Sequence, residues 1–174
     1  MFEEDRSVPL TRLPLAIWAM LIGFTLVPGV LYPWVHGWGA FPDLGLEFFG
    51  WLVALTLLHE GIHAVGWKYA SGLPWSAFKF GFAWKSLTPY CHAREAMPVG
   101  AYRIGSLLPL ALTGLLPWAA GMILGDGDLG LAAAVLIGGA AGDVWVFLSI
   151  RDLEPGALVR DHPENAGCVV MRPE

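Results

Sequence analysis

Four long apolar segments constrain the fold of this chain more than any other feature. They lie at about residues 13–34, 46–69, 104–124 and 131–150. Each has about the 20 residues that a helix needs to cross the hydrocarbon core of a bilayer. The composition agrees, since 56% of the residues are hydrophobic, nine are Trp and only 14% are charged. We therefore expect an all-α integral membrane protein that forms one domain over residues 1–174.

The first apolar segment, residues 13–34, carries no formal charge and follows a short polar N-terminus. It is too long for a secretory signal and lacks a small-residue cleavage site. We expect an uncleaved transmembrane helix whose end is kinked at Pro28-Gly29. At the other end of the chain, residues 151–174 are polar and contain Pro and Gly, so we expect a cytoplasmic tail that packs as an extension.

The region between the second and third segments, residues 75–95, has a different periodicity. Aromatic side chains alternate there with small or polar ones, as in a strand, at Phe78, Phe80, Phe82 and Trp84. Lys85-Ser86 would form a turn, and residues 87–93 would return as a second strand. We expect a short β-hairpin associated with the membrane surface. Its aromatic stripe fits plain lipid contact, and an exposed edge could also bind an extended peptide by strand addition.

The basic residues test this topology. They fall before the first span, between the second and third spans, and after the fourth: Arg6, Arg12, Lys68, Lys79, Lys85, Arg94, Arg103, Arg151, Arg160 and Arg172. With four spans these three regions share one side of the membrane, which the positive-inside rule identifies as cytoplasmic. Both termini are therefore expected in the cytoplasm.

Charge and cysteine content exclude some classes of function. The net charge is −5, and no basic patch suggests a nucleic-acid surface. Cys91 and Cys168 lie far apart, without metal-binding spacing, on the side where thiols stay reduced, so we expect no disulfide. The partners to expect are the lipid bilayer and a membrane protein or peptide, while the oligomeric state is left open.

A metal-ligand pattern lies inside the second apolar segment. His59 and His63 are four residues apart, so on a helix their imidazoles share one face, and Glu60 lies next to the first of them. Ionisable groups inside a membrane span are costly and rare, which makes them candidates for function. The alternative is that the two histidines and Glu60 are polar contacts between helices.

Asp143 is the candidate third ligand, because catalytic zinc usually takes three protein ligands. It is the single charged residue of the fourth segment. At 1.5 Å per helical residue, His63 and His59 lie roughly 8 to 14 Å from the cytoplasmic end at Lys68, and Asp143 lies roughly 12 Å from the end at Arg151. The matched depth fits a shared Zn²⁺ site. Asp143 could instead cap a helix break near Gly142 or pair with a histidine.

In this interpretation zinc lowers the pKa of a bound water toward 7, and Glu60 transfers the proton during peptide hydrolysis. The other polar candidates favour plainer roles. His36 and His92 have no partner at metal-ligand spacing, so we expect them at the membrane interface. Asp161 and His162 are adjacent, a poor arrangement for chelation, and we expect them to pack within the tail.

These features resemble the intramembrane zinc metalloproteases of the site-2 protease type, and more closely the small bacterial and archaeal families of zincin peptidases. The resemblance rests on the His59–His63 motif, the strand-like 80–90 stretch, Tyr102-Arg103-Ile104 leading to Leu108-Pro109, Ala141-Gly142-Asp143 and Asp161-His162-Pro163. It implies that His59, His63 and Asp143 bind zinc and that Glu60 is the catalytic acid and base. It also implies cleavage of transmembrane or membrane-proximal peptides in a prokaryotic cytoplasmic membrane.

Two other classes of function remain open. A catalytically silent scaffold or chaperone could retain the zincin helix as structure, and it predicts that Glu60→Gln changes nothing. A divalent-metal transporter could use His59, His63 and Asp143 as a transit site. Transport would require a polar track through the membrane, whereas the ionisable groups here cluster toward one side.

Overall fold

The computed structural model describes residues 2–9, 12–84, 88–163 and 165–172. Four of its helical stretches are long and apolar enough to cross a membrane, at Leu15–His36, Leu46–Ser71, Val99–Leu124 and Gly127–Ser149. The prediction of four spanning segments is thus confirmed, by length and composition.

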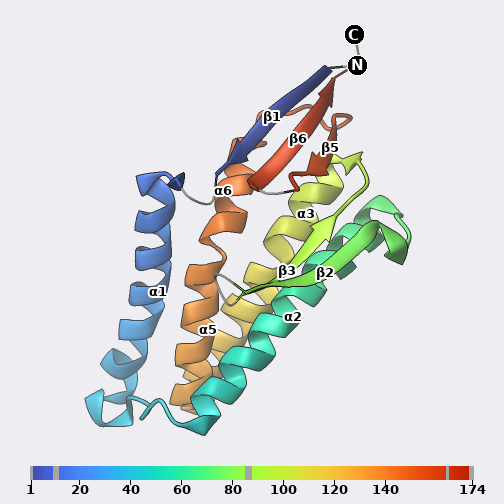
Figure 1. Ribbon diagram of the computed structural model, residues 1–174. Helices are drawn as coiled ribbons and strands as arrows, with labels where there is room; N and C mark the ends of the chain where they lie inside the picture. Colours follow the sequence, from blue (N-terminus) through green and yellow to red (C-terminus); the bar gives the residue numbers. More distant parts are fainter. Residues whose placement is uncertain (1, 10–11, 85–87, 164, 173–174) are drawn as a thin grey trace. The chain divides into compact units, whose positions relative to one another are not determined.

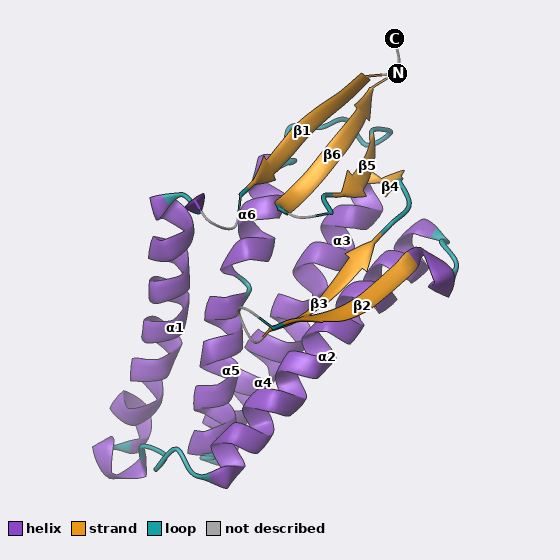
Figure 2. Ribbon diagram, viewed as in Figure 1, coloured by secondary structure: helices purple, strands orange, loops and turns teal. Residues whose placement is uncertain are grey.

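The chain is mostly helical, with two small antiparallel sheets (Figures 1 and 2). The helices are α1 (Leu15–His36), α2 (Leu46–Ser71), α3 (Val99–Pro109), α4 (Leu116–Leu124), α5 (Gly127–Gly139) and α6 (Ala141–Ser149). A π-helical segment, η4 (Leu110–Leu115), joins α3 to α4, and short 3-10 turns are η2 (Trp38–Ala40) and η3 (Trp75–Ala77). The strands are β1 (Phe2–Val8), β2 (Phe78–Ala83), β3 (Thr88–Ala93), β4 (Met97–Pro98), β5 (Leu158–Asp161) and β6 (Ala166–Arg172).

Two helix starts differ from the expected ones. The last spanning stretch begins at Gly127 rather than near residue 131, because Asp126 caps it by accepting the Leu129 N–H at 3.0 Å. The third begins at Val99 rather than near residue 104. Arg103 is accommodated in this earlier turn because its guanidinium donates to the carbonyls of Ile150 and Leu153, at 2.5 and 2.9 Å, beyond the end of α6.

The packing divides the chain into two compact units. Unit 1 comprises residues 1–14, 60–108 and 142–174, and unit 2 comprises residues 15–59 and 109–141. The helix α2 belongs to both units, since the division falls between His59 and Glu60.

Unit 2 is a helical assembly in which α5 packs against α1, α4 and η4 (Figure 1). Its hydrophobic core contains Phe48, Leu55, Leu129, Ala132, Ala133 and Leu136. Small residues allow the close approach of α1 and α5. A Cβ added at Gly138 would overlap the Thr25 side chain, and one added at Gly130 would lie 3.2 Å from the Tyr32 ring.

Unit 1 contains both sheets (Figure 2). The larger sheet has the order β1-β6-β5-β4, and β1 pairs antiparallel with β6 from Phe2 opposite Arg172 to Val8 opposite Ala166. The N-terminal segment and the tail thus pair as strands, which the expectation of an all-α fold with a packed tail did not include. Arg6 ties this sheet to the end of α6, donating to the Ser149 carbonyl at 2.9 Å and to Asp152 at 2.5 Å.

The smaller sheet of unit 1 pairs β2 with β3, from Phe78 opposite Ala93 to Ala83 opposite Thr88. Gly81 is needed in this pair because the Tyr90 ring lies where its Cβ would be. The turn expected at Lys85-Ser86 lies outside the described residues. The location of these strands at a membrane surface remains a prediction.

Candidate metal centre

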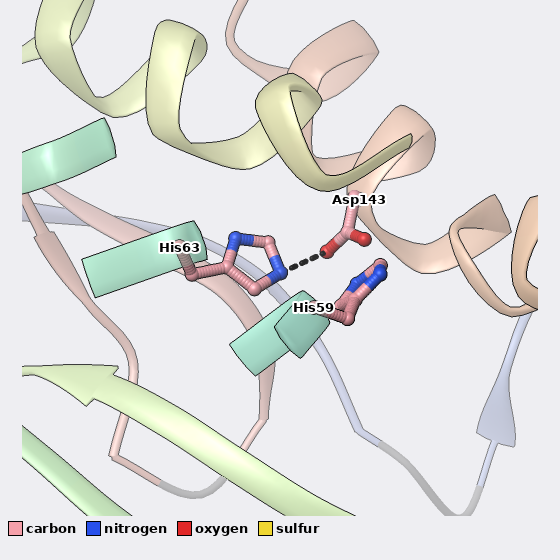
Figure 3. Close-up of side chains that lie close together, drawn as sticks. All are labelled: His59, His63 and Asp143. Atoms are coloured by element: carbon pink, nitrogen blue, oxygen red, sulfur yellow. Dashed lines mark ion pairs between the residues drawn. The ribbon is translucent and has the colours of Figure 1, made fainter. Parts of the chain in front are cut away.

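Helix α2 carries three of the four predicted site residues, and α6 carries the fourth. His59 and His63 are buried at 8% and 6% exposure, one helical turn apart, while Asp143 lies in the first turn of α6. One ligand atom from each of these three residues lies within 4.8 Å of the other two (Figure 3). The structure therefore brings together His59, His63 and Asp143 as a group that can hold a metal ion.

The separation of His63 and Asp143 fits two ligands of one ion better than a direct hydrogen bond. Nε2 of His63 lies 3.5 Å from Oδ1 of Asp143 (Figure 3). A good hydrogen bond between these atoms would be about 2.7–3.2 Å long. Ligand atoms about 2.0–2.1 Å from a tetrahedral zinc are about 3.3–3.4 Å from each other. The observed distance is close to that edge length.

A backbone carbonyl orients the ring of His63. Its Nδ1 lies 2.9 Å from the carbonyl oxygen of Gly105, so Nδ1 carries the proton and donates it. Nε2 then keeps its lone pair toward Asp143. The approach depends on small residues, because a Cβ at Gly66 would lie 2.9 Å from Gly105 Cα and one at Gly105 would overlap the indole of Trp67.

A hydroxyl on η4 orients the ring of His59. Nδ1 of His59 lies 3.1 Å from Oγ1 of Thr113, and Thr113 donates its hydroxyl to the Pro109 carbonyl at 2.8 Å. Because that proton is already used, the Thr113 oxygen accepts from His59, which fixes the proton on Nδ1 and the lone pair on Nε2. Partners of this kind on the second ring nitrogen are typical of metal-bound histidines.

An aromatic stack supports His63 from its other side. The rings of His63 and Trp67 are 5.1 Å apart, and those of Trp67 and Tyr102 are 5.5 Å apart, both nearly parallel. Trp67 also donates its indole N–H to the Tyr102 carbonyl at 3.2 Å. Trp67 and Tyr102 belong to the buried core of unit 1, so the histidine is backed by close-packed rings rather than by mobile side chains.

Glu60 contacts strand β3. Its Oε2 accepts the backbone N–H of Cys91 at 2.7 Å. A charge-assisted bond of this length holds the carboxylate in one orientation. This contact has no signal in the sequence, because the donor is a main-chain group on a strand about 30 residues away.

The remaining polar candidates lie elsewhere. His36 contacts the Met122 carbonyl through Nε2 at 3.0 Å. His92 pairs with Asp161 through Nδ1 at 3.0 Å, and His162 lies 4.0 Å from Asp5. None of these residues belongs to the candidate metal group. The interfacial placement of His36 and His92 remains a prediction.

Both cysteines are free and buried. Burial, together with the negative charge of Glu60 and Asp161, raises the pKa of the Cys91 thiol to about 12. Burial and Asp161 likewise raise the pKa of Cys168 to about 12. Neither thiol belongs to the candidate metal group.

The donor set fits zinc. Two imidazole nitrogens and one carboxylate oxygen match the His₂-carboxylate sets of catalytic zinc sites, which leave a fourth position for water or substrate. Fixed protons on both Nδ1 atoms leave the Nε2 lone pairs for the ion. The residues present are thus those that would hold a zinc ion.

Comparison with protein families gives an independent result. Residues 52–158, more than half of the chain, match the model of a family described as "putative zincin peptidase". His59, Glu60, His63 and Asp143 all lie within the matched range. Comparison with curated proteins and with solved structures gives no match. The chain belongs to this family of zincin peptidases, which indicates a zinc metallopeptidase.

Proposed function

We propose that the protein is an intramembrane zinc endopeptidase, similar to the site-2 proteases, that hydrolyses membrane-embedded or membrane-proximal peptides. The observation that carries this proposal is the group formed by His59, His63 and Asp143, whose ligand atoms lie within 4.8 Å of one another. The two histidines lie on a helix that is long and apolar enough to cross a membrane. A peptidase site on such a helix meets substrates that are themselves in the bilayer.

Glu60 has the role of general base and acid in this proposal. Zinc at the site would supply Lewis-acid chemistry, polarising the peptide carbonyl and acidifying the attacking water. The Glu60 carboxylate takes the proton of that water and passes it to the nitrogen of the leaving amine. The hydrogen bond from the Cys91 N–H keeps the Glu60 carboxylate oriented. Glu60 is also the residue next to the ligand His59 in the sequence.

Orientation and access follow from the charge distribution. Every Lys and Arg falls on one side of the four-span topology, so we place both termini in the cytoplasm of a prokaryotic cell. The shallow depth of the two histidines from that side makes the cytoplasm the route for water. Cysteine-free variants with single reporter cysteines in the tail, labelled from either side of oriented vesicles, test this topology.

A peptidase assay tests the proposed reaction. The purified chain, loaded with zinc in detergent, would be incubated with labelled casein and with a Leu/Ala-rich transmembrane peptide carrying a fluorophore and a quencher. We expect hydrolysis by the wild type, and about 10²–10⁴-fold less by Glu60→Gln at equal zinc content. Equal turnover by Glu60→Gln would instead favour the silent scaffold. Zinc uptake by proteoliposomes that is independent of Glu60 would favour the transporter.

A further inference from the structure

Asp161 is the centre of a second polar cluster in unit 1. It ends β5 and its carboxylate is mostly shielded, at 16% exposure. Oδ1 accepts the Tyr102 hydroxyl at 2.7 Å, and Oδ2 accepts the Ala93 N–H at 3.3 Å. His92 Nδ1 lies 3.0 Å from the same Oδ2. One carboxylate therefore connects strand β5 with strand β3 and helix α3.

The contacts of Asp161 and Glu60 lie on the same edge of β3. Cys91 and Ala93 are two residues apart, so their N–H groups point the same way along the strand. Their protons go to Glu60 and Asp161 rather than to β2, which pairs with the other edge. Two carboxylates thus occupy the edge of β3 where a third strand would pair.

We propose that Asp161 is a positioning residue, which fixes this edge of β3 so that the Cys91 N–H holds the carboxylate of Glu60. The inference rests on the proposed role of Glu60 as general base. It extends the site to the C-terminal strands, beyond the residues 52–158 that match the family model.

The physical reason is that, among the described residues, β3 pairs with β2 alone, although its Cys91 and Ala93 side chains pack in the core of unit 1. It belongs to a two-stranded sheet, and an isolated pair of strands is only marginally stable. At its C-terminal end the Arg94 N–H donates to the Ala77 carbonyl, which belongs to the same hairpin region. Asp161 attaches the strand to β5 and, through Tyr102, to the stack that backs His63. The candidate ligand His63 and the proposed base Glu60 are thereby positioned by the same core of unit 1.

Amide exchange tests the proposal directly, because the chain has only two cysteines. The full-length protein, labelled with ¹⁵N-cysteine, gives one amide signal for Cys91 and one for Cys168. Cys91 reports the bond to Glu60, and Cys168, opposite Asp161 in the β5–β6 pair, reports the larger sheet. The comparison uses wild type, Asp161→Ala, Glu60→Ala and the double variant, with Asp43→Ala, at an exposed position of unit 2, as the control aspartate.

In Asp161→Ala we expect hydrogen exchange at Cys91 to accelerate about tenfold or more while exchange at Cys168 changes less than about twofold. Asp43→Ala leaves both rates unchanged. The double variant exchanges at Cys91 no faster than Glu60→Ala alone, because both substitutions break the same bond. Zinc content stays at the wild-type level, since Asp161 is not a ligand.

Three results would overturn the proposal. The first is an unchanged exchange rate at Cys91 in Asp161→Ala, and the second is an equal acceleration at Cys168. The third is a double variant in which the effects of Asp161→Ala and Glu60→Ala on the Cys91 exchange rate multiply. If Asp161→Ala does not fold, Tyr102→Phe removes the hydroxyl that donates to Asp161 at 2.7 Å and lies 3.4 Å from the Gly167 carbonyl. Faster exchange at Cys91 is again the expected result, and an unchanged rate again overturns the proposal. Exchange does not depend on turnover. A wild type without peptidase activity would therefore refute the proposed function while leaving the placement of Glu60 by Asp161 to be decided separately.

Discussion

The two compact units are stabilised by different kinds of contact. Unit 2 has an apolar core and close helix packing at small residues, as between Gly138 and Thr25. Unit 1 combines an apolar core with partly buried polar contacts, such as those of Tyr102 with Asp161 and of Arg103 with the end of α6. Substitutions at the helix-packing glycines of unit 2 should therefore change packing alone, whereas those beside His63 in unit 1 should also change the orientation of a metal ligand.

The largest effect is expected for Gly105→Ala in unit 1. Its new methyl group would overlap the Trp67 indole, which stacks on His63, beside the carbonyl that orients that histidine. We expect a loss of about 1–3 kcal/mol in the free energy of unfolding. Trp fluorescence during thermal unfolding in detergent measures this loss. Zinc affinity should fall about tenfold or more. Gly100→Ala is the matched control, because nothing lies within 4 Å of its Cβ position.

Thr113→Val sharpens the comparison, because it removes the hydroxyl that orients His59. Valine has nearly the same shape but cannot accept the Nδ1 proton of His59. Zinc affinity, measured by competition with a chromophoric chelator, should weaken about 10–100-fold. Thr113→Ser keeps the hydroxyl and should keep most of the affinity. Equal zinc affinity in the valine and serine variants would show that the Thr113 hydroxyl does not orient His59 for metal binding.

Gly138→Ala tests the packing of unit 2 away from the site. The methyl group would overlap Thr25, whose side chain can rotate, so we expect a loss of about 1 kcal/mol in stability. Gly139→Ala, with open space at its Cβ position, serves as the control. Zinc affinity should stay at the wild-type level in both variants. A loss of zinc affinity in Gly138→Ala comparable to that of Gly105→Ala would break the comparison.

The smallest effect is expected for the thiols of unit 1. With pKa values raised to about 12 by burial, Cys91 and Cys168 should react with maleimide at pH 8 only after unfolding. Mass spectrometry of the folded, labelled chain should show no adduct. An adduct on either residue before unfolding would show that the core of unit 1 opens more readily than its packing indicates.

The helices of this protein could be predicted from the sequence because their signals are local. An apolar stretch of sufficient length identifies each span, and a lone charge within one identified Asp143. The sequence pattern predicts starts for α3 and α5 that are five and four residues late, because Arg103 and Asp128 resemble loop residues. Arg103 caps α6, and Asp126 caps the helix that contains Asp128.

The contacts that orient the site could not be predicted in the same way. The β1–β6 pairing joins the two ends of the chain, and no local pattern encodes a partner so distant. Thr113, the Gly105 carbonyl and the Cys91 N–H carry no charge and belong to no motif. The small residues Gly66 and Gly105 were the available signal, since glycines inside helices often mark close approach.

The most direct test of the account is the zinc content of the purified chain, measured by elemental analysis after zinc loading and removal of free metal. We predict about one zinc per chain in the wild type and in His36→Ala, and little in His59→Ala, His63→Ala or Asp143→Ala. A wild type without zinc, or Asp143→Ala with full zinc content, would contradict the proposed metal centre.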